Sequence, residues 1–252
     1  MVVAPGGPGT SARTAVVWEL LTAAIAEASA GRDGAPLQVV DAGGGTGGFA
    51  VPLAEAGCSV TVIDPSPDSL AALARRADEH GLADRVRGVQ GDLEDLSSVV
   101  DAASVDLVLC HSVLQVVDDP AAALRAVAAV LRPGGRLSLL VGNRNAVVLA
   151  RALAGRPDEA AHALTDPAGR WGDGDGVPRR WTPDDLVALV TGAGLHVEQL
   201  HGVRVVADLI PSAALDFEPG APAALLALER SLADRSPFRD LATSLHVLAV
   251  RR

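Results

Sequence analysis

Short apolar segments alternate with longer amphipathic segments through the first half of the chain. Runs of four to six residues rich in Val, Leu and Ile predict strands at 37–40, 59–63, 86–89, 105–109 and 136–141. Between them, the spacing predicts helices at 47–56, 67–80 and 120–131. Short apolar strands that alternate with helices predict an α/β protein with a parallel sheet and helices on both of its faces.

The alternation is weaker at both ends of the chain and in one internal segment. Residues 11–30 predict an N-terminal helix, and 221–232 predict a helix between two further strands at 196–200 and 245–250. Thr182 and Pro183 fit the N-cap and first position of a helix that runs to Gly192. The segment before it is helical only at 146–154, and a loose stretch this long is typical of a lid or substrate-binding insertion.

The amino-acid composition limits which partners the protein is expected to bind. The formal net charge is −10, and all 21 basic residues are Arg. This balance disfavours broad binding to nucleic acid or to an anionic membrane. Neither the two cysteines nor the six histidines have the spacing of metal ligands, so we expect no metal site. With no leader-like segment and no apolar run long enough to cross a membrane, we expect a cytoplasmic protein.

Five glycines occupy the six positions from Gly43 to Gly48, between the first predicted strand and the first predicted helix. Ligands bind at this place in open α/β sheets, because glycine lets the backbone approach and the helix start offers free N–H groups. The pattern also fits a dinucleotide-binding turn or a plain tight turn. Asp41 favours a cationic ligand, since its carboxylate would repel a diphosphate there by about 1–4 kcal/mol.

Two more acidic positions follow the next strands. Asp64 ends the second strand, where a carboxylate can accept hydrogen bonds from ribose hydroxyls, although it could instead cap the next helix. Asp92 and Leu93 follow the third strand, where an adenine edge would lie, although Asp92 could be an ordinary turn residue. Together these positions frame a nucleoside pocket.

With these positions, the sequence resembles the class I S-adenosylmethionine-dependent methyltransferases. Asp41–Gly48, Ile63-Asp64, Gly91-Asp92-Leu93, Asp106–Leu109 and Leu131–Gly135 match the motifs of that class in order. The resemblance implies a Rossmann-like, doubly wound sheet of seven strands, mostly parallel with a C-terminal antiparallel strand. It also implies S-adenosyl-L-methionine as the cofactor and S-adenosyl-L-homocysteine as its product.

The resemblance also divides the chain. We expect a disordered tail at 1–10 and one methyltransferase domain at 11–252. Within that domain we expect a cofactor-binding core at 36–142, a lid or insertion at 143–181 and a substrate-side part at 182–252.

Within the class, the chain is similar to the bacterial tRNA 5-carboxymethoxyuridine methyltransferases. The matching segments include Arg13–Trp18, Cys110–Leu114, Gly202–Val205 and Leu245–Val247. The resemblance implies that Arg13 holds the methionine carboxylate and that His111 lies at the reactive end of the cofactor. The remaining cofactor-binding residues that we predict are Asp41, Gly43, Gly44, Gly45, Asp64, Asp92 and Leu93.

The acceptor side is open between two classes. His111 is our candidate catalytic residue, with a buried, hydrogen-bonded histidine as the alternative. Arg144 and Arg204 could pair with an anionic acceptor, and Asn143 is grouped with them as a substrate residue. The resemblance favours tRNA. The acidic charge, the absence of Lys and the acidic Gly172–Gly176 segment favour a small metabolite or natural product.

Two further hypotheses about the function have less support from the sequence. One is an NAD(P)-dependent oxidoreductase, which would use the same glycine turn. The other is a module that binds the adenosyl ligand without catalysing a reaction. We make no prediction of the oligomeric state.

Overall fold

A computed structural model of the chain describes residues 14–30, 34–210 and 220–252. Its strands form one seven-stranded sheet in the order β3-β2-β1-β4-β5-β7-β6, mostly parallel with antiparallel strands at the C-terminal end. The strands are β1 (Gln38–Ala42), β2 (Ser59–Asp64), β3 (Val86–Gln90), β4 (Val105–His111), β5 (Leu131–Gly142), β6 (Leu195–Val203) and β7 (Ser244–Arg251). The predicted Rossmann-like α/β class is confirmed.

The helices differ from the prediction mainly where short or polar segments turn helical. They are α1 (Ala15–Ser29), α2 (Ala50–Glu55), α3 (Pro67–Glu79), α4 (Leu96–Val99), α5 (Pro120–Val130), α6 (Arg144–Leu153), α7 (Pro157–Thr165), α8 (Pro183–Gly192), α10 (Ala221–Leu232) and α11 (Phe238–Leu241). Helices α4, α7 and α11 were not predicted. The four residues of α4 and of α11 are too few to show an apolar period, and α7 lies in a segment that shows none. Helix α2 begins at Ala50 instead of 47, since the glycines before it form turns. Among the described residues, no helix has the length and apolar character needed to cross a bilayer.

The chain folds into two compact units. The first, here called the glycine-loop unit, comprises the described residues of Thr22–Leu139, Ala188–Glu198 and Val247–Arg252. The second, the insertion unit, comprises those of Met1–Leu21, Leu140–Val187 and Gln199–His246. The predicted cofactor-binding core at 36–142 lies almost wholly in the former, and the predicted insertion at 143–181 lies in the latter. The predicted tail at 1–10 lies outside the described residues.

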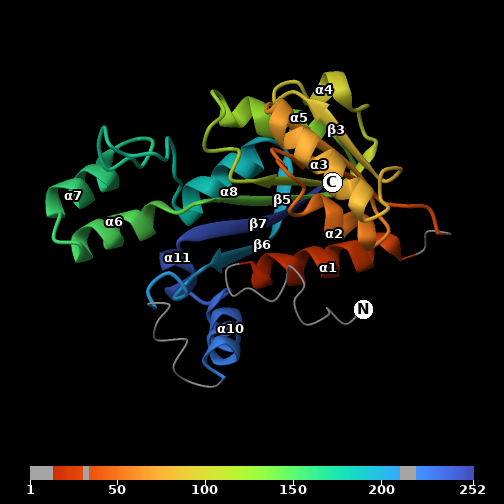
Figure 1. The fold of residues 1–252 in the computed structure, drawn as a ribbon. Helices are drawn as coiled ribbons and strands as arrows, with labels where there is room; N and C mark the ends of the chain where they lie inside the picture. Colours follow the sequence, from red (N-terminus) through yellow and green to blue (C-terminus); the bar gives the residue numbers. More distant parts are fainter. Residues whose placement is uncertain (1–13, 31–33, 211–219) are drawn as a thin grey trace. The chain divides into compact units, whose positions relative to one another are not determined.

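In the glycine-loop unit, the strands β1 to β4 are parallel neighbours, with Val40 of β1 opposite Thr61 of β2 and Val108 of β4. Helix α2 packs on β2 and α3 packs on β3 (Figure 1). Strand β4 is buried along nearly its whole length, which explains why it reads as a continuous apolar run. Because these neighbouring strands are parallel, their carboxyl ends lie along the same edge of the sheet.

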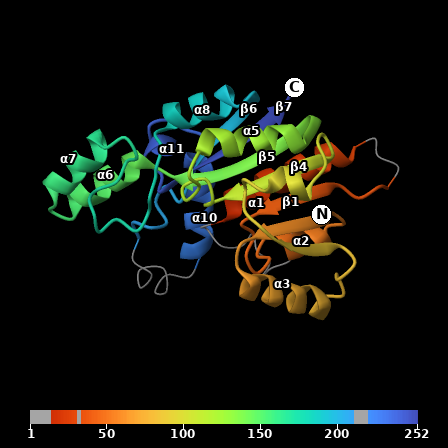
Figure 2. The same ribbon diagram turned by 90° about the horizontal axis from the view of Figure 1, so that it is seen from above.

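In the insertion unit, helices α6 and α7 lie side by side (Figure 2). The loop that follows them has no apolar period, yet it is ordered by the buried carboxylate of Asp175. That carboxylate pairs with both terminal nitrogens of Arg180, at 2.6 and 2.9 Å, and accepts backbone N–H groups from Trp171 and Val177. Arg151 stacks on the Trp171 ring, 3.8 Å from its centroid. Polar contacts therefore order a segment that shows no hydrophobic pattern.

This network generates a first prediction. Burial opposes ionisation of Asp175, but hydrogen bonds from Arg180 and the two backbone amides outweigh it and lower its pKa to about 2. Asp175→Asn should lower the free energy of unfolding by about 2–4 kcal/mol at pH 7, because it leaves Arg180 without its charged partner. The contribution is present above the ordinary pKa of 3.8 and is lost as the pH falls toward 2.

Denaturant titration at pH 7 measures the effect, and Asp173→Asn is the matched control because Asp173 is exposed in the same loop. The control should change stability by less than about 0.5 kcal/mol. Equal losses in the two variants would show that Asp175 does not order the loop.

Candidate functional site

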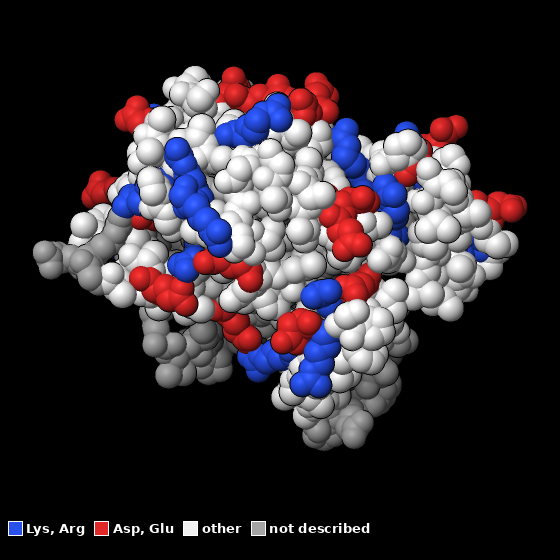
Figure 3. Space-filling model, turned by 180° about the vertical axis from the view of Figure 1, so that it is seen from behind, with Lys and Arg blue, Asp and Glu red and all other residues white. Residues whose placement is uncertain are grey.

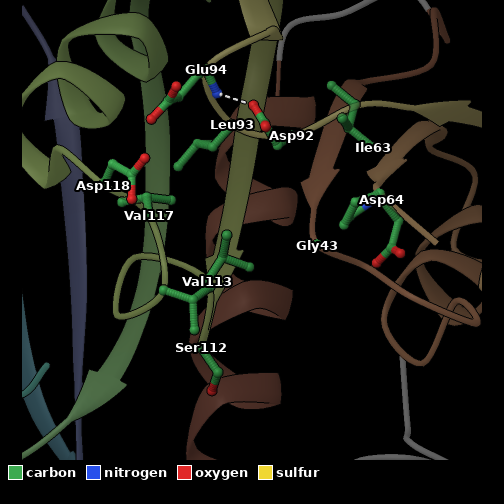
Figure 4. A pocket seen from close by; sticks show the side chains of 12 residues that line it. Gly43, Ile63, Asp64, Asp92, Leu93, Glu94, Ser112, Val113, Val117 and Asp118 are labelled. Carbon is green, nitrogen blue, oxygen red and sulfur yellow. Dashed lines mark hydrogen bonds between the residues drawn. The ribbon is translucent and has the colours of Figure 1, made fainter. Parts of the chain in front are cut away.

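The carboxyl ends of β1, β2, β3 and β4 surround a cavity of about 430 Å³ in the glycine-loop unit. Figure 4 shows Ile63 and Asp64 on one side of it, and Val113 and Val117 on the other. Its lining residues are Gly43, Ile63, Asp64, Pro65, Asp92, Leu93, Glu94, Ser112, Val113, Val116, Val117 and Asp118. Four of these described lining residues are acidic and none is basic. The cavity therefore suits a ligand with positive charge.

The glycine turn enters this cavity at Gly43. Its N–H donates to the Ile63 carbonyl at 2.7 Å, and its φ of +67° is a left-handed conformation that favours glycine. A Cβ atom on Gly43 would collide with Val113 on the opposite side of the cavity. Val113 therefore packs so close to the backbone of Gly43 that only glycine fits there.

Asp41 lies beneath the turn and not in the lining of the cavity. Its side chain is 2% exposed, and its Oδ2 has no hydrogen-bond partner. A Cβ on Gly44 would stand 2.5 Å from that oxygen. Burial, and secondly the nearby charge of Asp64, raise the pKa of Asp41 to about 7. A buried carboxyl without a partner is costly, and a cation bound above the turn would offset that cost.

Asp64 belongs to the cavity and also holds the turn in place. Its Oδ2 accepts the N–H of Gly45 at 3.0 Å, and its Oδ1 accepts the N–H of Ser66 at 2.9 Å. The alternative that Asp64 caps the next helix is wrong, because the Ser66 side chain caps α3. Asp92 accepts the N–H of Glu94 in a turn and also lines the cavity, and its contact with adenine stays a prediction. Leu93 is buried and contributes an apolar wall.

His111 ends β4 but is not among the lining residues, whereas its neighbour Ser112 is. Its Nε2 lies 2.9 Å from the Ser138 hydroxyl, and its ring meets Phe49 edge-on with centroids 4.7 Å apart. Burial lowers the pKa of His111 to about 3, so the imidazole is neutral at pH 7. A side chain this weakly basic is poorly suited to take a proton from an alcohol.

The predicted substrate residues lie in the insertion unit. The Asn143 side chain donates to the carbonyls of Asp240 and Ala242, at 3.0 and 2.7 Å, and accepts the N–H of Asn145 as the N-cap of α6. All of these contacts are internal. They give Asn143 a bracing role between α6 and the segment around α11.

The two predicted arginines also have partners within the insertion unit. Arg144 donates to the Pro167 carbonyl at 2.8 Å. Arg204 donates to the Ser244 hydroxyl at 2.9 Å and pairs with Asp208 at 3.2 Å. A substrate anion would have to compete with Asp208 for this guanidinium.

Sequence reasoning missed most of the second side of the cavity. Ser112, Val113, Val117 and Asp118 follow β4, and Glu94 follows β3. Their only signal is their position after the carboxyl end of a strand, which is where ligands bind in this class of fold. Arg13 lies outside the described residues. No group of metal-binding side chains occurs in the parts of the chain that the structure describes.

Comparisons with known proteins agree with this geometry. A family model described as a methyltransferase domain matches residues 40–139. A tRNA 5-carboxymethoxyuridine methyltransferase of Escherichia coli (strain K12) is 30% identical over 237 residues, which cover 94% of this chain and 87% of that protein. A ubiquinone biosynthesis O-methyltransferase of Xanthomonas axonopodis pv. citri (strain 306) is 35% identical over 180 residues, 69% of each chain.

Among solved structures, a geranyl diphosphate C-methyltransferase from Streptomyces coelicolor A3(2) is similar, with a TM-score of 0.62 and 17% identity. The match covers 94% of this chain and 78% of that chain, which was solved with Mg²⁺, geranyl diphosphate and S-adenosyl-L-homocysteine. At this identity the likeness is one of fold.

The close contact between Gly44 and Asp41 generates a second prediction. Gly44→Ala should weaken binding of S-adenosyl-L-homocysteine at least about tenfold, because its Cβ would displace the Asp41 carboxylate and shift the turn. Gly48→Ala is the matched control, since a Cβ there has no atom within 4 Å. Calorimetry measures both affinities. Equal affinities would mean that the ligand does not depend on the turn.

The buried Asp41 carboxyl generates a third prediction. Between its ordinary pKa of 3.8 and its folded value of about 7, the folded protein keeps a proton that the unfolded chain loses. Stability therefore falls as pH rises through that window. Asp41→Asn should stabilise the ligand-free protein by about 2–4 kcal/mol more at pH 8 than at pH 4.

Urea titrations at the two pH values measure this difference. Asp84→Asn serves as the control, because Asp84 is exposed. A gain for Asp41→Asn that does not change with pH would contradict the assignment of a raised pKa to this carboxyl.

Proposed function

This chain belongs to the class I S-adenosylmethionine-dependent methyltransferases, and from that premise we propose that it methylates an oxygen of a small-molecule acceptor. Its cofactor is S-adenosyl-L-methionine and its product is S-adenosyl-L-homocysteine. The class of acceptor and the roles of individual residues are what we propose.

The observation that carries the proposal is the charge of the cavity. Asp64, Asp92, Glu94 and Asp118 face it, and no basic side chain is among the described lining residues. S-adenosyl-L-methionine presents a sulfonium and an ammonium, which carboxylates attract. A diphosphate or a phosphodiester would meet repulsion of about 1–4 kcal/mol from each carboxylate near 4 Å. The same charges that favour the cofactor therefore disfavour a polyanion here.

The residues present fit the adenosyl group. Gly43 brings the backbone of the turn to the lining of the cavity, and Asp41 is a buried carboxyl with an unpartnered oxygen beneath the turn. We assign the backbone contacts to Gly43, Gly44 and Gly45. Asp64 would accept the ribose hydroxyls, while Asp92 and Leu93 would meet the adenine. Arg13 is our candidate for the methionine carboxylate.

When bound, the cofactor would supply an activated methyl group, whose bond to sulfur would break as its bond to the acceptor oxygen forms. The protein has to align the two partners and exclude water. A carboxylate or phenolate acceptor is already ionised and needs no base. Because the imidazole of His111 is neutral and weakly basic, we assign it to shaping the region near the methyl group and not to proton abstraction.

A second candidate is methylation of tRNA. It is supported by the 30% identity to a tRNA methyltransferase over 94% of this chain. On the face drawn in Figure 3, however, Arg side chains lie among carboxylates and uncharged surface, without a continuous basic area. The protein has a formal net charge of −10, so it repels tRNA over most of its surface. Binding of tRNA would therefore need a local basic contact, which a small acceptor does not require.

Transfer of radiolabelled methyl from S-adenosyl-L-methionine tests the proposal. The acceptors are bulk tRNA and a panel of phenols, hydroxylated metabolites and carboxylates. We expect label in members of the panel, none in tRNA at low or high salt, and measurable calorimetric binding of S-adenosyl-L-homocysteine but not of NADH. Label in tRNA alone, with binding that falls steeply with salt, would replace the small acceptor by tRNA.

A further inference from the structure

A buried carboxyl group lies beneath the glycine turn with one oxygen unpaired. Asp41 is the last residue but one of β1, and its side chain is 2% exposed. Its Oδ2 has no hydrogen-bond partner in the part of the chain that the structure describes. Buried polar groups in folded proteins are nearly always hydrogen-bonded, so an exception of this kind indicates a role beyond the folding of the chain.

The turn that covers Asp41 also forms part of the wall of the cofactor cavity. A Cβ atom on Gly44 would stand 2.5 Å from Oδ2 of Asp41 and 3.0 Å from a methyl carbon of Val62. The preceding glycine, Gly43, belongs to the lining of the cavity. A charge in the cavity therefore acts on the Asp41 carboxyl across the backbone of the turn, where it is screened less than it would be in water.

The ionisable neighbours of Asp41 come from the two strands beside β1. Strand β2 ends at Asp64, whose charge opposes ionisation of Asp41. Strand β4 ends with Cys110 and His111, and burial raises the pKa of Cys110 to about 12 and lowers the pKa of His111 to about 3. Both are therefore uncharged between pH 6 and pH 8. The turn itself, residues 43–49, has no ionisable side chain. None of these described groups supplies a positive charge to Asp41.

Without a ligand, the carboxyl of Asp41 is therefore half protonated near neutral pH. Burial, and secondly the charge of Asp64, raise its pKa to about 7. A positive charge in the cavity would stabilise the ionised form and lower this pKa. Because linkage is reciprocal, a cation that makes the proton easier to lose is itself bound more weakly while the proton stays.

We infer that Asp41 is a specificity-determining residue that gives up a proton when a cationic adenosyl ligand binds, so that the site prefers this ligand over uncharged adenosyl compounds more strongly at pH 8 than at pH 6. The inference rests on the proposed function and adds a pH-dependent selection to the same site. The proton passes from the Asp41 carboxyl to the solvent, and no other bond changes.

Calorimetry on the full-length protein tests the inference with two ligands that share the adenosyl thioether. S-adenosyl-L-homocysteine carries an ammonium group, whereas 5′-methylthioadenosine is uncharged. The dissociation constant of the first should fall about tenfold from pH 6 to pH 8, because the proton has to be displaced only at the lower pH. The dissociation constant of the second should not change with pH.

The same titrations count the protons when they are repeated in two buffers that differ in their enthalpy of ionisation. Binding of S-adenosyl-L-homocysteine should release close to one proton at pH 6 and close to none at pH 8. Binding of 5′-methylthioadenosine should release none at either pH. This count uses the wild-type protein, so it does not depend on the folding of any variant.

Two variants assign the proton to a residue. Asp41→Asn removes the titrating group, so its affinity for S-adenosyl-L-homocysteine should be independent of pH and binding should release no proton. Asp84→Asn is the matched control, because Asp84 is exposed in the same unit, and it should keep the pH dependence of the wild-type protein.

The outcomes separate the inference from the proposed function. S-adenosyl-L-homocysteine that binds equally well at both pH values, without release of a proton, would overturn the inference and leave the cofactor assignment standing. Equal release by both ligands would also overturn it, since the charge of the ligand would then not be the cause. So would a pH dependence that Asp41→Asn retains. A protein that binds S-adenosyl-L-homocysteine at neither pH would contradict the proposed function, and the inference with it.

Discussion

The site depends on two neighbouring carboxylates and the glycines packed against them. Asp41 is buried beneath Gly44 with an unpartnered oxygen, and Asp64 holds the N–H of Gly45. Burial, and secondly the charge of Asp64, raise the pKa of Asp41, and a cation at the turn would favour its ionised form. No side chain fits at Gly43 or Gly44, because its Cβ would strike Val113 or Asp41.

The sequence predicted this half of the site because its determinants are local. A glycine run directly after a strand, with an acid two residues before it and another at the end of the next strand, needs no tertiary information. The sheet class follows from the same alternation. The opposite wall of the cavity was missed, since residues such as Val113 and Asp118 are recognisable only once β4 is known to lie beside β1. Contacts such as that between His111 and Ser138 likewise join residues far apart in sequence.

The substrate-side residues stay predictions. Polar residues near a strand end suggested acceptor binding, and in the structure Asn143, Arg144 and Arg204 each have hydrogen-bond partners inside the insertion unit. A sequence cannot show whether a polar side chain serves a ligand or braces the backbone. For the same reason, the sequence did not predict that the loop around Asp175 is ordered. There, an ion pair between Asp175 and Arg180 takes the place of an apolar core.

A second cavity lies within the insertion unit, between helix α6, the segment 205–209 and helix α11, and it differs in charge from the cofactor cavity. The cofactor cavity is acidic, with four carboxylates, whereas the cavity of the insertion unit is apolar, with one carboxylate that an arginine balances. A tRNA acceptor would need cations that remain available after internal pairing, and Arg204 is already engaged by Asp208. The 30% identity to a tRNA methyltransferase supports a tRNA acceptor, whereas the acidic cofactor cavity and the net charge of −10 support the small acceptor that we propose.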